Sequence, residues 1–365
     1  MGCGASMPVS DMKWMDEVLD STGPAGVSWQ GPRPNKAKVF ESYKFGDTLG
    51  TGGFAVVRLA TCRSTGKNCA MKVMTLPNPK ESGGHNEREN IFYEIGLLAR
   101  LQSEYIIRLD EFFVENNKVY LATELLAGGD LLDAVIESGS YDESMARRIF
   151  RRVVLGVQYL HSEGITHRDI KLENLLLGDK FDLSTVKICD LGLAKKATDR
   201  LVHSACGTPQ YVSPEVVNSK KGDAHGPSVD TWACGVVLFI LLCGYPPFAH
   251  KTETTLYALI CAGDYSFTQS SVWEVITDDA KDLIRSFLTV NQSTRITADD
   301  ALRHPWFQNS SLESETCMSL GLTQSALKKY RGKFKSAVNA IRTINRVNRL
   351  VGISGGASVR RSVYL

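Results

Sequence analysis

The sequence predicts an α+β protein with a small β-rich N-terminal lobe and a large, mostly helical C-terminal lobe. Apolar and β-branched residues surround a glycine-rich loop between Tyr43 and Ala60, and a further short run lies at 68–74, as in a hairpin-rich sheet. From Leu131 onward, helical spacing of apolar residues dominates. With 365 residues and 43% apolar content, the chain can bury a large core or two joined lobes.

We expect the chain to divide into four segments, whose exact bounds follow from a family resemblance given below. Its first forty residues hold Gly, Pro and Ser clusters with little apolar periodicity, which predicts a flexible arm without a fold of its own. The expected segments are the arm at 1–40, the small lobe at 41–126, the large lobe at 127–307 and a basic tail at 308–365.

Inside the lobes, the clearest elements are a helix at 91–101, a strand at 119–126 and a long apolar run at 233–243. Residues 77–88 are polar and contain Ser-Gly-Gly, so we expect a loop there. The apolar run is about half of the ~20 residues that a membrane-spanning helix needs. We therefore interpret it as a buried helix.

Cysteine usage and charge limit the class of protein. Nine cysteines without a secretory signal indicate a reducing compartment, and most of them are expected to be small core residues. The net charge of +2 hides an asymmetry, because residues 316–365 hold ten Lys or Arg and no Asp or Glu. The first 315 residues then carry 32 basic against 40 acidic side chains.

The glycine-rich loop at 50–57 follows one predicted strand and leads into another. A dinucleotide-binding turn would instead deliver its phosphates to the N-terminus of a helix. Because glycine lacks a Cβ, backbone N–H groups of such a loop can approach phosphate oxygens closely. Taken alone, the segment could also be an ordinary glycine-rich hairpin.

Three further motifs supply charged groups suited to phosphate transfer. Lys72 lies in the strand after the loop, and Glu94 lies in the helix predicted next. The run His167–Asn174 contains an aspartate, a lysine and an asparagine, and Asp190 opens an Asp-Leu-Gly motif. Lysine suits phosphate oxygens, and carboxylate oxygens suit Mg²⁺.

In this order and spacing, the motifs resemble those of eukaryotic protein kinases, and in particular the calcium/calmodulin-dependent serine/threonine kinases of type I. The resemblance continues through motifs at 207–215 and 303–307, so it covers residues 43–307. It implies a bilobal protein kinase fold and transfer of a phosphoryl group from ATP, with Mg²⁺, to serine or threonine. Leu191 departs from the usual phenylalanine but remains apolar.

The resemblance assigns roles to the charged residues. Asp169 is expected to accept or orient the proton of the substrate hydroxyl, and Lys171 to neutralise the γ-phosphate. Lys72 is expected to contact the α- and β-phosphates while an ion pair with Glu94 holds it in place. The implied metal ligands are Asn174 and Asp190.

The resemblance also implies two structural features. Glu215 and Arg295 are expected to form a buried scaffold bridge, and His167 is expected to be structural rather than catalytic. Thr123 is expected to guard the back of the adenine pocket. The implied nucleotide-binding residues, besides Lys72, are Leu49, Gly50, Thr51, Gly52, Gly53, Phe54, Ala55, Val57, Ala70, Glu124, Leu126 and Leu176.

Substrate choice and activation follow from the same resemblance. Asp130 and Glu173 correspond to carboxylates that face ribose or substrate arginine, which implies a preference for an arginine three residues before the target. Ser204, four residues before Thr208, occupies the place of the activation-loop phosphosite. A phosphate added there by an upstream kinase could pair with Arg168, although Ser204 could equally be an ordinary surface serine.

The tail suggests a regulator. Residues 328–350 mix basic and apolar side chains that share a helical stripe, a pattern found in calmodulin targets, in membrane-surface helices and in merely basic faces. Its position after a kinase domain favours calmodulin. The resemblance implies that residues 310–335 lie across the substrate cleft until calcium-loaded calmodulin removes them. The expected apolar anchors are Phe334, Val338, Ile341 and Val347.

The N-terminus fits an acylation pattern, with Gly2 exposed after methionine removal and a serine four places later. Cys3 is a candidate for palmitoylation, and a second acyl chain would convert marginal into stable membrane attachment. We therefore expect a location at the cytoplasmic face of membranes with a cytosolic pool, and no nucleic-acid partner.

Two alternatives remain at this point. A kinase-like scaffold without catalysis would be expected to lack Lys72, Asp169 or Asp190, and all three are present. Alternatively, an active kinase could use its basic tail to bind anionic lipids instead of calmodulin.

Overall fold

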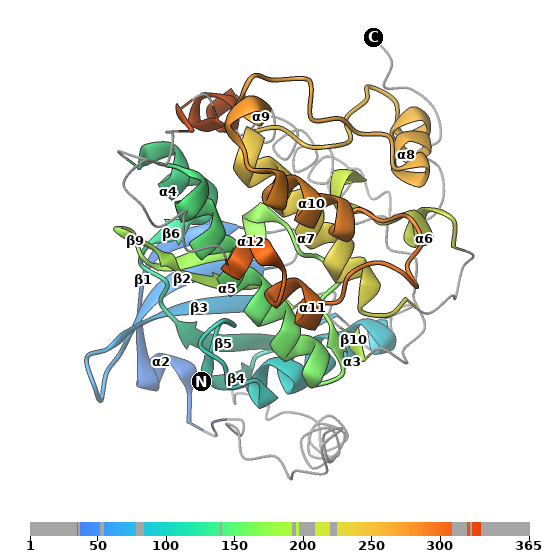
Figure 1. The fold of residues 1–365 in the computed structure, drawn as a ribbon. Helices are drawn as coiled ribbons and strands as arrows, with labels where there is room; N and C mark the ends of the chain where they lie inside the picture. The colour runs from blue at the N-terminus through green and yellow to red at the C-terminus, as the bar shows by residue number, and fades with distance from the viewer. Residues whose placement is uncertain are drawn as a thin grey trace.

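The small lobe is built on a five-stranded antiparallel sheet with strand order β1-β2-β3-β5-β4, and a long helix, α3, packs against it (Figure 1). The strands and helix are β1 Tyr43–Thr51, β2 Ala55–Cys62, β3 Asn68–Thr75, α3 Gly84–Arg100, β4 Leu109–Glu115 and β5 Lys118–Glu124. This computed structural model describes residues 35, 37–51, 55–77, 84–138, 141–191, 195–196, 209–219, 225–308, 320–321 and 323–329.

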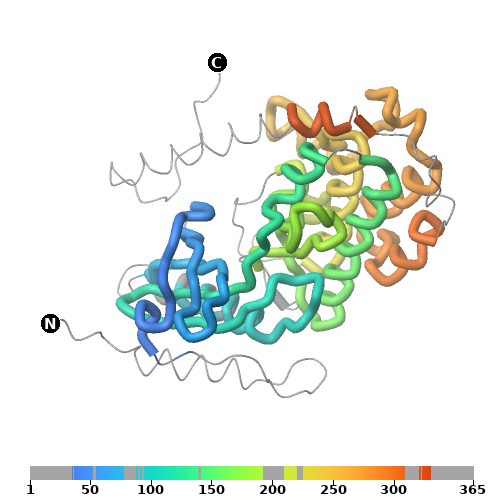
Figure 2. Tube along the Cα trace, turned by 90° about the vertical axis from the view of Figure 1, so that its left-hand side faces the viewer, coloured from blue at the N-terminus to red at the C-terminus, as the bar shows by residue number. Residues whose placement is uncertain are grey.

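The large lobe is mostly helical and follows β5 directly (Figure 2), so the predicted α+β architecture of two lobes is confirmed. Its main helices are α4 Leu131–Glu137, α5 Glu143–Ser162, α6 Pro214–Val217, α7 Ser228–Cys243, α8 Glu253–Ala262, α9 Val272–Val275, α10 Asp278–Phe287, α11 Ala298–Leu302 and α12 Pro305–Gln308. Short strands pair as β6-β8-β9 and β7-β10, with bounds β6 Gly129–Asp130, β7 Ile165–Thr166, β8 Leu175–Asp179, β9 Asp182–Ile188 and β10 Lys195–Lys196.

Helix α7 forms the centre of the large lobe. Every residue from Val229 to Cys243 is buried, which confirms the predicted buried helix and extends it by several residues toward the N-terminus. Gly235 allows α10 to approach closely, because a Cβ there would lie 2.7 Å from the Cβ of Phe287. In the part of the chain that the structure describes, no helix is both long enough and apolar enough to cross a membrane.

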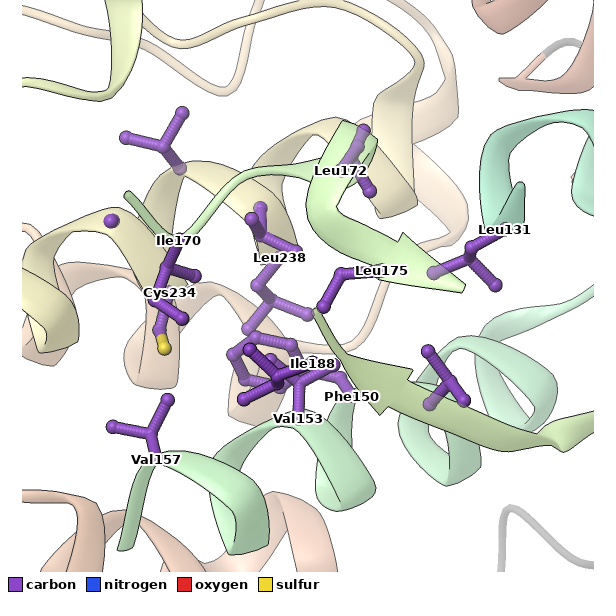
Figure 3. Close-up of a cluster of buried hydrophobic side chains, with 14 of the residues drawn as sticks. Leu131, Phe150, Val153, Val157, Ile170, Leu172, Leu175, Ile188, Cys234 and Leu238 are labelled. Atoms are coloured by element: carbon purple, nitrogen blue, oxygen red, sulfur yellow. The ribbon is translucent and has the colours of Figure 1, made fainter. Parts of the chain in front are cut away.

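The loop between β7 and β8 is tied to this core by alternate apolar side chains. Figure 3 shows Ile170, Leu172 and Leu175 pointing into a cluster shared with α5 and α7. All three are at most 1% exposed. Burying these side chains fixes the path of the loop, which includes the short 3-10 helix Leu172–Asn174.

The two faces of the five-stranded sheet have different coverings. Register places Val57 opposite Lys72 and Ala70 opposite Thr123, so these side chains share the face that also packs on α3 and the large lobe. The opposite face carries a separate buried cluster that includes Met71.

Asn35 and residues 37–42 cover that second face, although we expected residues 1–40 to be a flexible arm. Val39, in the short helix α2 (Val39–Ser42), is fully buried in the outer cluster. The amide of Asn35 donates to the Glu111 carboxylate at 2.6 Å, and the Val39 N–H donates to Glu115 at 3.2 Å. Two carboxylates on β4 therefore fasten the end of the arm, a long-range contact that local composition does not reveal.

Helix α3 begins at Gly84, whereas the polar composition of 77–88 predicts a loop. Arg88 explains part of this difference. It is 7% exposed and donates to the carbonyl of Pro77 and to Oδ1 of Asn117, at 3.2 and 3.0 Å. The β4–β5 turn and the segment after β3 thus each supply a partner for an arginine that would otherwise favour solvent.

The described part of the tail packs on the large lobe. The Thr323 hydroxyl donates to the carbonyl of Leu242 at 2.8 Å, and the Gln324 amide donates to that of Val135 at 2.9 Å. Leu327 is fully buried. This segment, red in Figure 1, lies beside the end of α4.

Gly244 makes this docking possible. It ends α7 with a φ of +83°, and a Cβ there would lie 2.5 Å from the Cβ of Ala326. We expected residues 310–335 to lie across the substrate cleft. The hydrogen bonds of residues 320–329 within the described chain instead lead to α4, to α7 and to Tyr141 between α4 and α5.

The expected bridge between Glu215 and Arg295 is confirmed. The guanidinium is fully buried and binds both carboxylate oxygens, at 2.7 and 2.9 Å. It also donates to the carbonyl of Ser228 at 2.7 Å and lies over the Trp232 ring. One side chain thereby joins α6, α7 and the α10–α11 connection.

We predict that Arg295→Met lowers the free energy of unfolding by about 3–5 kcal/mol, because it leaves a nearly buried carboxylate without its partner. Urea unfolding followed by tryptophan fluorescence measures the change. Arg303→Met is the matched control, since the Arg303–Asp300 pair is largely exposed and its loss should have little effect on stability. Equal effects of the two changes would contradict the scaffold role.

Candidate active site

Lys72 lies on the inner face of the sheet and contacts two carboxylates. Its Nζ lies 2.9 Å from Oε1 of Glu94 on α3 and 3.2 Å from Oδ1 of Asp190 after β9. Burial alone would lower the pKa of Lys72, but the two carboxylates raise it above its ordinary value. The ammonium therefore stays charged, and it joins sheet, helix and large lobe at one point.

Asp169 is the centre of a second polar group in the β7–β8 loop. Its Oδ2 accepts from Lys171 Nζ at 2.6 Å and from Asn174 Nδ2 at 3.0 Å. The same Asn174 amide donates to the Asp169 carbonyl at 2.8 Å. With both side chains bound, the carboxylate has a defined orientation at the loop surface.

Asp230, in the first turn of α7, fixes the backbone of this loop. Its carboxylate is fully buried and accepts from the backbone N–H groups of His167 and Arg168, at 2.8 and 2.7 Å, and from the ring of His161 at 2.9 Å. Arg168 has a φ of +68°, which is uncommon for a residue with a side chain. The two bonds to Asp230 help to hold this strained conformation immediately before Asp169.

The pKa of Asp230 reflects these bonds. Burial alone would raise it, but the hydrogen bonds from the His161 ring and from the Arg168 N–H lower it below its ordinary value. The carboxylate therefore stays ionised in the core. Its contribution to stability is present above the unfolded pKa of about 4 and is lost as the pH falls through the lower folded value.

His167 links the two polar groups. Its Nδ1 accepts from the Asp169 N–H at 3.2 Å, so its Nε2 carries the proton that is donated to the Cys189 carbonyl at 3.3 Å. The ring is fully buried, as expected for a structural residue. It connects the Asp169 loop to the residue before Asp190, whose φ of +61° again shows a strained backbone.

The residues expected around a nucleotide line both lobes. Leu49, Gly50 and Thr51 end β1, with Leu49 51% exposed, and Ala55 begins β2. The Thr123 hydroxyl is buried and donates to the carbonyl of Ala70 at 3.2 Å. In the large lobe, Leu176 on β8 is half-buried and pairs with Lys187 on β9. The hinge residues Glu124 and Leu126 are half-buried as well.

The donor groups fit a magnesium ion bound together with phosphate. Both hydrogens of the Asn174 amide face Asp169, which leaves its Oδ1 as a possible ligand. Within the described residues, no group of three or more His, Cys, Asp or Glu side chains could hold a metal by itself. Mg²⁺ is commonly bound by one or two protein carboxylates plus substrate phosphates, and Asp190 and Asn174 supply oxygen ligands of the kind it takes.

Glu173 differs from the other acidic residues of the loop. Its two carboxylate oxygens are buried, and neither has a hydrogen-bond partner among the described residues. Its pKa is raised to about 7, mainly by burial and to a smaller extent by the charges of Asp130 and Asp169, while its own backbone N–H and the charge of Lys171 act in the opposite direction. Asp130 itself caps α4 by accepting from the Leu132 N–H at 2.8 Å.

Several predicted residues lie outside the described part of the chain, and the structure adds nothing to their assignments. They are Gly2, Cys3, Gly52, Gly53, Phe54, Ser204, Thr208, Phe334, Val338, Ile341 and Val347.

Sequence reasoning missed two residues that shape the site. Asp230 was not among the expected site residues, yet a carboxylate at the start of an otherwise apolar helix signals a buried partner. Lys187 pairs with Glu124 at 2.7 Å, and nothing in the local sequence marks that contact.

Comparisons with known proteins agree with this geometry. The protein kinase domain family matches residues 43–307. Calcium/calmodulin-dependent protein kinase type 1 of Caenorhabditis elegans is 38% identical over 86% of this chain and 88% of its own length. The enzyme of the same name from Macrobrachium nipponense is 37% identical over 85% and 87%.

The fold comparison gives the same answer. The twitchin kinase region of C. elegans superposes with a TM-score of 0.76 at 27% identity, over 85% of this chain and 54% of that longer one. Fold, site geometry and relatives agree, and the chain therefore belongs to the protein kinase family, among the calcium/calmodulin-dependent serine/threonine kinases.

Proposed function

We propose that this kinase is held inactive by its C-terminal tail and is activated when calcium-loaded calmodulin binds that tail. Phosphorylation of Ser204 by an upstream kinase would add a second level of control. The observation that carries the catalytic part is the pair of linked groups, Asp169 with Lys171 and Lys72 with Glu94, held on opposite lobes by buried contacts.

In the proposed reaction, Asp169 orients the substrate hydroxyl and accepts its proton. Lys171, already 2.6 Å from that carboxylate, neutralises charge on the transferred phosphoryl group. Lys72 binds the α- and β-phosphates, and its ion pair with Glu94 lets it do so without reorganisation. Asn174 and Asp190 would hold Mg²⁺, which supplies electrostatic stabilisation of the phosphate charge when bound.

The tail contacts support regulation at this end of the chain. Residues 320–329 are docked beside α4, so the expected anchors from Phe334 to Val347 begin only a few residues beyond a fixed point. A related twitchin kinase structure is described as an autoregulated protein kinase, at 27% identity to this chain. The competing proposal is a constitutively active kinase whose basic tail binds anionic membranes, and a scaffold without catalysis is a further alternative.

We predict low activity of the full chain on an Arg-x-x-Ser peptide with Mg-ATP, rising at least about tenfold, ~1.4 kcal/mol of coupling, with calcium/calmodulin. A chain ending at Lys329 keeps the docked helix and should be active without calmodulin. The double variant Phe334→Asp, Ile341→Asp should no longer be activated by calmodulin. The Asp169→Asn variant, which lacks the catalytic carboxylate, gives the background rate of the assay.

Other outcomes of this assay point to the alternatives. Equal activity of the full and shortened chains without calmodulin would reassign the tail, and salt-sensitive, calcium-independent binding to anionic vesicles would identify it as a lipid anchor. If the shortened chain, after phosphorylation by an upstream kinase, phosphorylates none of a varied set of peptides, the scaffold without catalysis would be favoured.

Glu173 supports the proposed preference for an upstream arginine. A buried carboxylate without a partner gains a charge-assisted bond when a guanidinium reaches it, and Asp130 and Asp169 nearby also favour a cation. Ionised Glu173 is required for this bond.

We predict that the KM for an arginine peptide rises as the pH falls below about 7, where Glu173 becomes protonated. Glu173→Gln should raise that KM about tenfold at pH 8, ~1.4 kcal/mol, and remove the pH dependence. Glu137→Gln is the matched control, because Glu137 is 56% exposed on α4. A peptide with alanine in place of arginine should show neither effect, and a Glu173→Gln enzyme with unchanged KM would contradict this role.

We also propose a membrane location through acylation of Gly2 and Cys3, with a cytosolic pool. A myristoyl chain alone gives an association constant on the order of 10⁴ M⁻¹, so Cys3 acylation is needed for stable attachment. Gly2→Ala should move the protein to the soluble fraction in cells, and Cys3→Ser should do so partly. Gly4→Ala, which keeps both acylation sites, should not. An unchanged membrane fraction in Gly2→Ala would exclude this mode of attachment.

A further inference from the structure

A second ion pair joins the two lobes behind the proposed nucleotide site. Nζ of Lys187 on β9 lies 2.7 Å from Oε1 of Glu124, the last residue of β5. The two side chains are only 17% and 16% exposed. This depth distinguishes the pair from Lys180–Glu137 at the same β8–β9 hairpin, where both side chains are 56% exposed.

Glu124 is also bound to the segment before β4. Its Oε1 accepts from the N–H of Arg108 at 2.8 Å, and its own N–H donates to the carbonyl of Arg108 at 3.0 Å. The side chain and the backbone of Glu124 therefore both bind the backbone of Arg108. The Glu124 carboxylate thus accepts from two donors in different parts of the chain, Lys187 Nζ and the Arg108 N–H.

The segment before β4 is in turn bonded to β9. The N–H of Ile188 donates to the carbonyl of Tyr105 at 2.9 Å, and the N–H of Ile107 donates to that of Ile188 at 3.0 Å. A closed ring results, from Glu124 to Lys187, along β9 to Ile188, across to 105–108 and back to Glu124. We name this ring the hinge clamp.

The hinge clamp connects the two ends of the proposed nucleotide site. Glu124 begins the hinge where the adenine is expected, and Lys187, on β9, lies three residues before Asp190, which follows the end of that strand. Lys187 is also paired in register with Leu176, the large-lobe residue expected beneath the adenine. A shift of β9 relative to β5 would thus change the spacing between hinge, Leu176 and Asp190 together.

We propose that Lys187 and the side chain of Glu124 are positioning residues for the nucleotide. By holding β9 against the hinge, they maintain the arrangement in which Lys72 contacts both Glu94 and Asp190. This inference rests on the proposed nucleotide site and adds a specific determinant of its affinity. Without Lys187, the Glu124 carboxylate would remain largely buried with the Arg108 N–H as its remaining bonded donor, so the clamp would loosen or take up water.

The test uses the full chain with Lys187→Met. Affinity for Mg-ADP is measured by calorimetry, and initial rates are measured against ATP and peptide with calcium/calmodulin present. We expect the Kd for Mg-ADP and the KM for ATP to rise about tenfold, ~1.4 kcal/mol. The KM for the peptide should change less than about twofold, and kcat less than the KM for ATP, because positioning of the nucleotide is what changes.

Three further variants test whether the loss of affinity comes from the Lys187–Glu124 pair. Lys187→Arg should retain most of the affinity, since it restores a cation at this place. Lys180→Met on the same hairpin should behave as the original protein. Adding Glu124→Gln to Lys187→Met should cost little more than Lys187→Met alone, because both changes break one interaction; if Lys187→Met fails to fold, Glu124→Gln alone is measured instead.

Each outcome bears on the proposal. Unchanged Mg-ADP affinity in a folded Lys187→Met or Glu124→Gln chain would overturn it, as would a loss shared equally by Lys180→Met. Activity that rises in Lys187→Met would also overturn it, by showing that the pair restrains the lobes instead of aligning them. If the original chain itself binds no Mg-ADP, the proposed nucleotide site fails, and that result is distinct from failure of the clamp.

Discussion

The structure around the site depends on one buried carboxylate, that of Asp230. Its position at the start of α7 places it in the most apolar part of the protein, where every later residue of the helix is buried. An unpaired charge there would be strongly unfavourable, and the hydrogen bonds from the His167 and Arg168 N–H groups offset the cost of burying it. The same two bonds fix the backbone of the loop that carries Asp169. The large lobe can keep this carboxylate ionised only while the loop bearing Asp169 holds its strained shape.

A chain of direct contacts connects Asp230 to the charged residues of the small lobe. A hydrogen bond to Asp230 fixes the backbone of His167, and the His167 ring in turn donates to the carbonyl of Cys189. The contact with Cys189 helps to fix the position of Asp190, the next residue. Asp190 reaches across to Lys72, and Lys72 to Glu94. The proposed phosphate-handling groups are therefore coupled by direct contacts between the lobes. Changes in lobe position should act on all of them at once, and this explains why a contact behind the hinge can matter for the nucleotide.

The sequence was sufficient for the fold and for the local motifs, and insufficient where contacts are long-range. Short motifs located Lys72, Asp169 and Asp190 because each sits in a pattern of neighbouring residues. Asn35 and Val39 were assigned to a flexible arm at 1–40, since their docking depends on Glu111 and Glu115, some 76 residues away in the chain. The Lys187–Glu124 pair was missed for the same reason, since the partners are 63 positions apart in the chain.

The docked part of the tail constrains how any regulation can work. Thr323, Gln324 and Leu327 bind a surface formed by the ends of α4 and α7, and the left-handed Gly244 leaves room for their backbone. These contacts are buried and hydrogen-bonded, so releasing them would cost more than moving a solvated chain. The proposed calmodulin anchors begin at Phe334, beyond this fixed point. A regulator could therefore bind the distal tail and clear the site while the docked helix stays in place, and the anchored helix would keep the tail close enough to return when the regulator leaves.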